Sequence, residues 1–256
     1  MIAVSIIMSL AVGPMQSPRG VAGPTVGLAA QPVVAGLILL GTLSVSLGIA
    51  VLVGKAINAA VGMFVLGWGV LVLSMQCGTI ADVVFDGSGI LPLVFEGVAW
   101  GIVVLVCSAI MFRLCGALPD IPVDDPSDAT RPSVVFSGDA LKSALAGLLL
   151  LVVVWLLLSN DLKGQAIAAA VIGGVLTGLG GRLLSPRVQP VLLFAVPVFV
   201  GVLGYAIAMS MMQRPADEMF VTSTLPTWAK VMPLDLAGGA LAGVSMGIGW
   251  ARGMLE

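Results

Sequence analysis

The fold is decided by residues 33–53, which read VVAGLILLGTLSVSLGIAVLV and carry no charge. An α-helix needs about twenty apolar residues to cross the hydrocarbon of a bilayer, so this stretch predicts a transmembrane helix. Similar apolar segments follow, separated by polar residues, glycine or proline, at 57–75, 91–112, 144–159, 165–184, 190–212 and 232–250. We therefore expect an all-α bundle of about seven transmembrane helices.

The composition agrees with such a bundle and not with a soluble domain. The 256 residues are 59% hydrophobic and 9% charged, whereas soluble domains carry about 25% charged residues. The eleven Lys and Arg residues are scattered and the net charge is −2, so the clustered basic surface that binds a phosphate backbone is missing. The expected partners are the lipid bilayer and, beyond it, other membrane subunits or a second copy of the chain, and not nucleic acid.

The chain contains no histidine and three cysteines. Imidazole is the usual general base near neutral pH and a common ligand of haem and zinc, and three dispersed thiols cannot form a four-thiolate metal site. The sequence also lacks a nucleophile elbow, a phosphate loop and an HExxH zinc motif. We expect no cofactor, and we do not expect an enzyme.

The apolar segments divide the chain into five parts. Residues 1–32 hold a short apolar run at 2–12, which is too short to span and is expected to pack on the bundle or lie in the interface; a signal sequence or an eighth helix is the alternative. The others are a first three-helix unit at 33–112, an acidic Pro-rich loop at 113–143, a second three-helix unit at 144–212, and an outer loop with a glycine-rich helix at 213–256.

Two short motifs recur in the two three-helix units. AGLILL from Ala35 recurs as AGLLLL from Ala146, and AINAAV from Ala56 recurs as AIAAAV from Ala166, at offsets of 111 and 110. Because three is an odd number of spans, a duplicated unit would lie upside down relative to the first, which is a common plan of transporters. Chance matching in a chain rich in alanine, glycine and leucine is the alternative.

The basic residues predict the orientation, because cytoplasmic loops retain Lys and Arg. With the N-terminus outside, seven basic residues lie on the inner side and four on the outer side. The inner ones are Lys55, Arg113, Arg131, Lys142, Arg182, Arg187 and Arg252, and the outer ones are Arg19, Lys163, Arg214 and Lys230. We expect an N-out, C-in protein of a bacterial inner membrane, since the loops are short and no Arg-rich leader is present.

Glu96 is the most interesting single residue. It lies about five positions into an apolar segment, roughly 8 Å along a helix axis, where a carboxylate needs a partner or water. It is a candidate for a proton or cation pathway with Asn58, Gln76 or Gln165 nearby; the alternative is a carboxylate close to the interface, reached by headgroup water or held by a hydrogen bond. Pro197 is a further candidate, because it falls near the middle of its segment and would kink the helix or mark a substrate site.

Glycines at four-residue spacing predict close helix packing, within the chain or in an oligomer. They are Gly97 with Gly101, Gly174 with Gly178, and Gly239 with Gly243 and Gly247. Asp235 stands near the start of the last segment, beside Pro233, and is expected to cap that helix.

The loop between the two units contains DDPSD, which places Asp124, Asp125 and Asp128 close together. This string resembles the DDxxD motif by which prenyl-diphosphate enzymes hold magnesium. The resemblance covers five residues, and the surrounding prolines favour an extended loop where those enzymes use a helix. The nearest second acidic pair, Asp82 with Asp86, is expected on the opposite face, so these residues are weak metal candidates and a solvated acidic loop is the preferred interpretation.

The sequence favours a small transporter-like or channel-like protein, because of the possible inverted repeat, Glu96 and Pro197. A structural or accessory subunit that packs through its glycine-rich helices is the alternative, since few polar residues lie in the spans. A membrane enzyme acting on a diphosphate depends on DDPSD alone.

Overall fold

The computed structural model describes residues 1–87, 89–121 and 131–255. Helices dominate these residues, and no strand forms among them. Seven helical stretches in the described chain are long and apolar enough to cross a membrane, namely Pro32–Ala56, Ala59–Gln76, Leu91–Cys115, Gly138–Leu157, Lys163–Leu184, Leu192–Met211 and Pro233–Leu255. The all-α bundle predicted from the sequence is confirmed.

Five of the spans are single helices, and two are composite. The single ones are α2 (Pro32–Ala56), α3 (Ala59–Gln76), α5 (Leu91–Cys115), α9 (Lys163–Leu184) and α12 (Pro233–Leu255). The fourth span joins α7 (Gly138–Ala144), a 3-10 segment η3 (Leu145–Leu148) and α8 (Leu149–Leu157), and the sixth joins η4 (Leu192–Phe194) to α10 (Val196–Met211). Shorter elements are α1 (Ile2–Ser9), η1 (Val26–Leu28), α4 (Ile80–Phe85), α6 (Pro132–Val135), α11 (Ala216–Val221) and η5 (Thr227–Lys230).

The sixth span differs from the expectation for Pro197. This residue lies in the first turn of α10, directly after the junction with η4 at Ala195. A proline in the first turn removes no intrahelical hydrogen bond, because the first N–H groups of a helix have no partner within it. The predicted interruption in the middle of a helix is therefore wrong, and Pro197 instead marks the change from 3-10 to α-helix.

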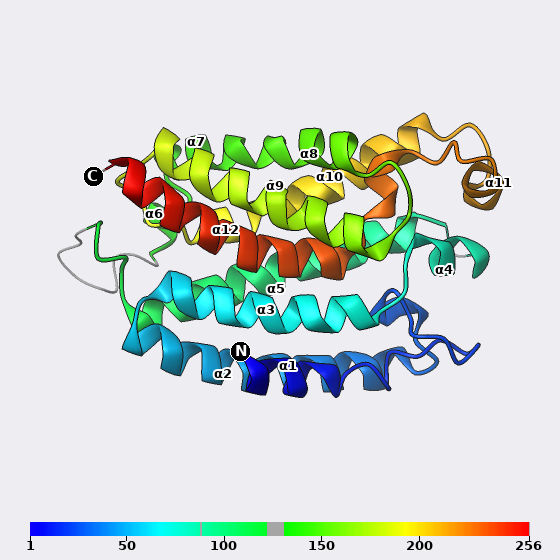
Figure 1. The fold of residues 1–256 in the computed structure, drawn as a ribbon, viewed down its shortest axis with the longest axis horizontal. Helices are drawn as coiled ribbons and strands as arrows, with labels where there is room; N and C mark the ends of the chain where they lie inside the picture. Colours follow the sequence, from blue (N-terminus) through cyan, green and yellow to red (C-terminus); the bar gives the residue numbers. More distant parts are fainter. Residues whose placement is uncertain (88, 122–130, 256) are drawn as a thin grey trace.

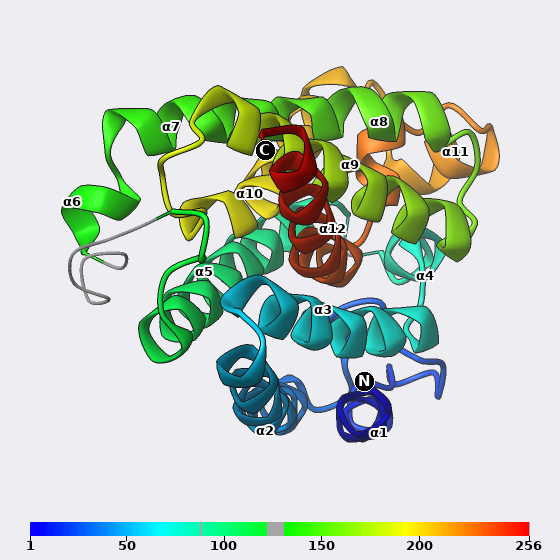
Figure 2. The same cartoon turned by 60° about the vertical axis from the view of Figure 1, so that its left-hand side comes forward.

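Helix α12 runs through the middle of the bundle, between α3 on one side and α9 on the other (Figures 1 and 2). Helix α2 covers α3 and α8 covers α9, so these five helices form a row. Helices α5 and α10 pack against each other beside that row, and both contact α12. Most of α12 is therefore buried, although it is the least hydrophobic of the seven spans.

The contact between α9 and α12 is made by glycines. A Cβ added at Gly174 would come within 2.5 Å of the Gly239 carbonyl oxygen, and one added at Gly243 would lie 3.0 Å from the Gly174 Cα. Gly178 lies against Gly247 in the same way. In a membrane, small residues allow helix backbones to approach where lipid gives no hydrophobic drive between helices. Gly97 and Gly101 serve the contact of α5 with α10, since they lie against Val202 and Phe199, respectively.

The N-terminal segment packs on the bundle. Helix α1 contacts α3 and α2, and its Val4 and Met8 lie against Gly69 of α3. The chain then passes through η1 into α2, and η1 contacts α5 as well as α2.

The two ends of the bundle carry different sites, and we refer to each by one residue. The Asp235 end, at the right of Figure 1, holds α4, α11 and the first turns of α5, α9 and α12. The Asn58 end, at the left, holds the α2–α3 connection, residues 116–121 after α5, and the last turn of α12.

Candidate functional site

Asp235 is a fully buried carboxylate in the first turn of α12. Its Oδ2 accepts a hydrogen bond from the backbone N–H of Met232 at 3.1 Å, which is the capping role predicted from the sequence. Its Oδ1 lies 2.8 Å from the Nζ of Lys163, the first residue of α9. The hydroxyl of Ser74 on α3 donates a hydrogen bond to the same Oδ1. One carboxylate therefore joins three helices at the Asp235 end.

The ammonium group of Lys163 has a second partner. Its Nζ donates a hydrogen bond to the Gly78 carbonyl oxygen at 3.0 Å, and the side chain is 16% exposed. The neighbouring Cys77, in the connection after α3, is 7% exposed. Burial raises the pKa of the Cys77 thiol to about 12, while the Lys163 charge acts in the opposite direction. The thiol is therefore protonated at neutral pH and lies within the electrostatic reach of the ion pair.

From the sequence, Lys163 is expected in an outer loop, and no sequence motif pairs it with Asp235. A signal for the pair was present, because both residues begin glycine-rich helices that were expected to enter the membrane from the same side. Two such helices that pack in parallel bring the charges of their first turns together. The sequence does not fix which helices pack, so the pair needed the structure.

Glu96 uses its carboxylate to hold the N-terminal segment. Its two oxygens accept the backbone N–H groups of Val26 at 3.2 Å and Gly27 at 3.4 Å, both in η1. Glu96 also lines a mainly apolar cavity of about 180 Å³ between α2 and α5. Glu96 therefore has the hydrogen-bonded surroundings that the sequence analysis gave as the alternative to a pathway.

The other candidate pathway residues do not gather around Glu96. Gln76 donates to Ser9 and to the Val72 carbonyl oxygen, each at 2.8 Å, and is exposed. Asn58 caps α3 at the opposite end, where its Oδ1 accepts the Val61 N–H at 3.0 Å. The sequence-based set is thus divided between the two ends of the bundle.

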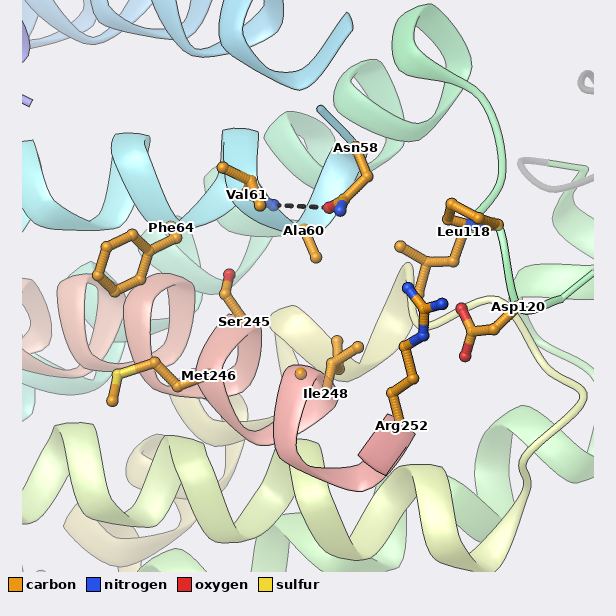
Figure 3. Close-up of a pocket in the computed structure, with 12 residues that line it drawn as sticks. Asn58, Ala60, Val61, Phe64, Leu118, Asp120, Ser245, Met246, Ile248 and Arg252 are labelled. Atoms are coloured by element: carbon orange, nitrogen blue, oxygen red, sulfur yellow. Dashed lines mark hydrogen bonds between the residues drawn. The ribbon is translucent and has the colours of Figure 1, made fainter. Parts of the chain in front are cut away.

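A pocket of about 450 Å³ opens at the Asn58 end, between α3, α12 and residues 118–120 (Figure 3). Its polar side chains are those of Asn58, Asp120, Ser245 and Arg252, and Phe64 and Met246 are among its apolar lining. Its volume falls in the range of sites for small molecules, which combine an apolar lining with a few polar groups.

The outer wall of this pocket is held by buried polar side chains. Asp120, toward which the Arg252 side chain extends in Figure 3, forms an ion pair with Arg182 of α9, whose side chain is 2% exposed. Gln189 accepts the Leu118 N–H and donates to the Ile121 carbonyl oxygen, each at 3.1 Å. These bonds fix residues 118–121 against the bundle, so the wall is a defined part of the fold.

The same two helices, α3 and α12, are closed along the rest of their contact. Gly67 lies against α12 in the middle, where an added Cβ would come within 2.5 Å of the Ala242 nitrogen. Ser74 and Asp235 close the contact at the far end. The pocket is therefore a one-sided opening along the α3–α12 contact.

The acidic loop candidates Asp124, Asp125 and Asp128 lie outside the described residues. The second acidic pair has structural partners. Asp82 forms a capping box with Thr79 at the start of α4, and Asp86 lies 3.1 Å from Arg19.

Comparison with protein family models, curated proteins and solved structures finds no match to this chain. The class of protein therefore follows from the helices of the chain itself. Seven helical stretches in the described chain are long and apolar enough to cross a bilayer. The chain is a multi-pass integral membrane protein.

Proposed function

We propose that the chain is a small-solute carrier whose binding pocket opens at the Asn58 end in this conformation. The observation that carries the proposal is the one-sided pocket along the α3–α12 contact. It has a volume of about 450 Å³ at one end, and the other end is closed by Ser74 and Asp235. Carriers work by alternating access, in which a site is reached from one side of the membrane at a time.

The helix arrangement supports an inverted repeat in this carrier. Helices α3 and α9 flank α12, α2 and α8 cover them in turn, and α5 meets α10, so each helix of the first unit has a counterpart with equivalent neighbours. Helix α2 starts at the Asp235 end, whereas the span of α8 starts at the Asn58 end (Figure 1). Opposite directions are what a duplicated three-helix unit requires, and the paired motifs AGLILL and AGLLLL fall in these counterpart spans.

The distribution of Lys and Arg supports an N-out, C-in orientation in a bacterial inner membrane. The pocket then faces the cytoplasm, and the Asp235 end faces outward.

Solute uptake into proteoliposomes tests the proposal. The chain, with its three cysteines replaced by alanine, is reconstituted and offered a radiolabelled neutral amino acid, a monosaccharide, a carboxylate and a primary amine. In the Ser245→Cys variant, a bulky thiol reagent would fill the pocket, so we expect uptake of the transported probe to fall at least tenfold. Gly253→Cys is the matched control, because it lies on the same helix in open space and outside the pocket lining. Absence of uptake for every probe, or equal inhibition at both positions, would overturn the proposal.

One observation favours a structural or accessory subunit as the second candidate. Buried charges in the described bundle have protein partners: Asp235 has Lys163, and Arg182 has Asp120. Fixed ion pairs suit a scaffold as well as a carrier. Purification in a mild detergent separates the two candidates, because a subunit co-elutes with other chains and gives no uptake, whereas a carrier purifies as a monomer or homodimer with uptake.

A further inference from the structure

The pocket at the Asn58 end has two unlike halves (Figure 3). Arg252, Asp120 and Asn58 form a polar half, and Phe64 and Met246 lie in an apolar half on the other side of the view. Along α3 and α12, Phe64 and Met246 stand six residues deeper in the bundle than Asn58 and Arg252, which is roughly 9 Å at the rise of an α-helix. The pocket therefore fits a ligand with a polar head toward the Asn58 end and an apolar body toward the middle of the bundle.

The polar half carries more positive than negative charge among the residues that the structure describes. Asp120 is its carboxylate, and two guanidinium groups approach it: Arg182 forms an ion pair with it, and the Arg252 side chain extends toward it (Figure 3). The side chain of Arg182 is 2% exposed and also donates to the Pro186 carbonyl oxygen at 2.6 Å, which fixes its position. Arg182 thus offsets the charge of Asp120 from behind the wall, and Arg252 adds a second positive charge at the pocket itself.

The hydrogen-bonding groups of the pocket favour a ligand that accepts hydrogen bonds. Asn58 uses its Oδ1 to accept the Val61 N–H at 3.0 Å, so its amide NH2 group is the one left for a ligand. A guanidinium has five N–H donors in a planar fork, which lets Arg252 hold a ligand carboxylate through two bonds beside its contacts within the protein. Ser245 donates its own proton to the Leu241 carbonyl oxygen at 2.7 Å, so it offers a ligand only the lone pairs of a neutral oxygen.

We propose that this pocket binds organic monocarboxylates, with Arg252 and Asn58 on the carboxylate and Phe64 and Met246 on the apolar body. The inference rests on the proposed carrier function and names its substrate class. A cationic head would meet the guanidinium of Arg252 and find Asp120 already engaged by Arg182. A zwitterion would lose at its ammonium group, for the same reason, what it gains at its carboxylate. The monoanion is the class that uses the excess positive charge.

Binding to the purified full-length protein in detergent at pH 7.5 tests the substrate class. Four radiolabelled compounds have the same branched apolar body: 4-methylpentanoate is an anion, 4-methylpentanamide is neutral, 3-methylbutylamine is a cation and leucine is a zwitterion. We expect 4-methylpentanoate to bind roughly tenfold or more tightly than each of the other three, because a hydrogen bond to a charged group is stronger than one between neutral groups. Equal affinity for the acid and the amide, tighter binding of leucine or the amine, or no binding of the acid would overturn the proposal.

Variants of Arg252 test whether this residue sets the preference. In Arg252→Gln we expect 4-methylpentanoate to bind roughly tenfold or more weakly, and the amide to bind as before. Arg252→Glu reverses the charge, so 3-methylbutylamine should then bind more tightly than the acid, a gain that a misfolded protein could not show. Arg187→Gln is the matched control, because Arg187 is an exposed arginine that follows α9 at the same end, outside the pocket lining. Unchanged affinity for the acid in Arg252→Gln, or an equal loss in Arg187→Gln, would contradict the assignment.

Uptake measurements separate this inference from the carrier proposal. If 4-methylpentanoate binds with the expected ranking but no probe enters proteoliposomes, the carboxylate site stands and the carrier fails. If another probe is taken up, and a thiol reagent at Ser245→Cys blocks its uptake while the acid does not bind, the carrier stands and the substrate class fails.

Discussion

Glu96 and Asp235 lie near the same end of the bundle, yet their surroundings give them different roles. Glu96 accepts hydrogen bonds from two backbone N–H groups of η1. Both donors are neutral and belong to the backbone. Asp235 accepts the Met232 N–H and also faces the Lys163 ammonium at 2.8 Å. A bond to a fixed N–H fastens a segment, whereas an ion pair is lost when either partner changes its charge. Glu96 therefore fastens the N-terminal segment to α5, whereas Asp235 holds α3 and α9 against α12.

Replacing Glu96 by glutamine should loosen the N-terminal segment without affecting transport. The amide keeps one acceptor oxygen but loses the negative charge, and a hydrogen bond to a charged group is worth about 2 kcal/mol. We expect trypsin to cleave after the exposed Arg19 faster in Glu96→Gln by roughly tenfold or more, with unchanged solute uptake. Glu218→Gln, on the exposed side of α11, is the control. Equal cleavage rates in both variants would contradict the assignment.

The Cys77 thiol provides a prediction for alkaline pH. Burial raises its pKa from the ordinary value of 9.0 to about 12, and the thiolate is the form that attacks a maleimide. In the Cys107→Ala, Cys115→Ala background, the rate of labelling by N-ethylmaleimide should therefore rise about tenfold per pH unit from pH 7 to pH 10 without levelling. A cysteine introduced at the open position Gly253 should level near pH 9. Levelling of Cys77 in the same range would show that its thiol is not buried.

At the scale of elements, apolar length predicted most spans closely, such as 33–53 for Pro32–Ala56. The fourth span begins at Gly138 and not at 144, because Ser137 caps it at 3.2 Å and the exposed pair Asp139–Lys142 forms its first turn. A segment chosen by its apolar residues leaves out a helical turn that is made of polar residues. The last span holds Asp235 and many glycines, which left open whether it is buried among its neighbours or lies partly in the interface. The structure shows that α12 is buried, because its low hydropathy accompanies contact with protein on two sides in place of lipid.

The candidate sites were less predictable than the helices. Asn58 was a candidate from the sequence and lines the pocket. The outer wall of the pocket, however, is held in place by Gln189, which binds Leu118, and by Arg182, which binds Asp120. These partners lie more than sixty residues apart in the chain. The partners of Asp235 likewise depend on the depth and rotation at which α3, α9 and α12 pack. Such contacts are tertiary, and apolar periodicity carries no information about them.

The glycine contact between α9 and α12 makes a prediction at this scale. In Gly174→Ala the new methyl group meets the Gly239 carbonyl oxygen, and overpacking of this kind costs about 1–3 kcal/mol. Gly48→Ala is the matched control, since Gly48 lies within α2 with nothing within 4 Å of an added Cβ, and alanine favours helix by about 1 kcal/mol. We expect unfolding in an SDS titration to occur earlier for Gly174→Ala and no earlier than wild type for Gly48→Ala. The reverse order would mean that α9 and α12 are farther apart.

At the scale of the whole molecule, the pocket and the buried Asp235 lie at opposite ends of the same contact between α3 and α12. The pocket opens it at the Asn58 end, and Ser74 with Asp235 closes it at the other. A carrier needs these two states to be coupled, so that opening one end disfavours opening the other. Under the proposed inverted repeat, α2, α3 and α5 would correspond to α8, α9 and α10, so the two ends would have comparable helices with which to open and close.

The side of the membrane to which the pocket opens depends on the orientation of the bundle. Reporter fusions determine this orientation. Seven spans in the described chain would place the start of α2 and the end of α12 on opposite sides, and the proposed orientation, which follows the excess of Lys and Arg, has the end of α12 inside. Alkaline phosphatase, which is active outside the cytoplasm, should be inactive when fused after Leu255 and active when inserted after Gln213, between α10 and α11. With that result, the pocket of the proposed carrier opens to the cytoplasm and the Asp235 end faces outward. The opposite activities would reverse both positions, and the pocket would then open outward while the ion pair of Asp235 and Lys163 would lie toward the cytoplasm.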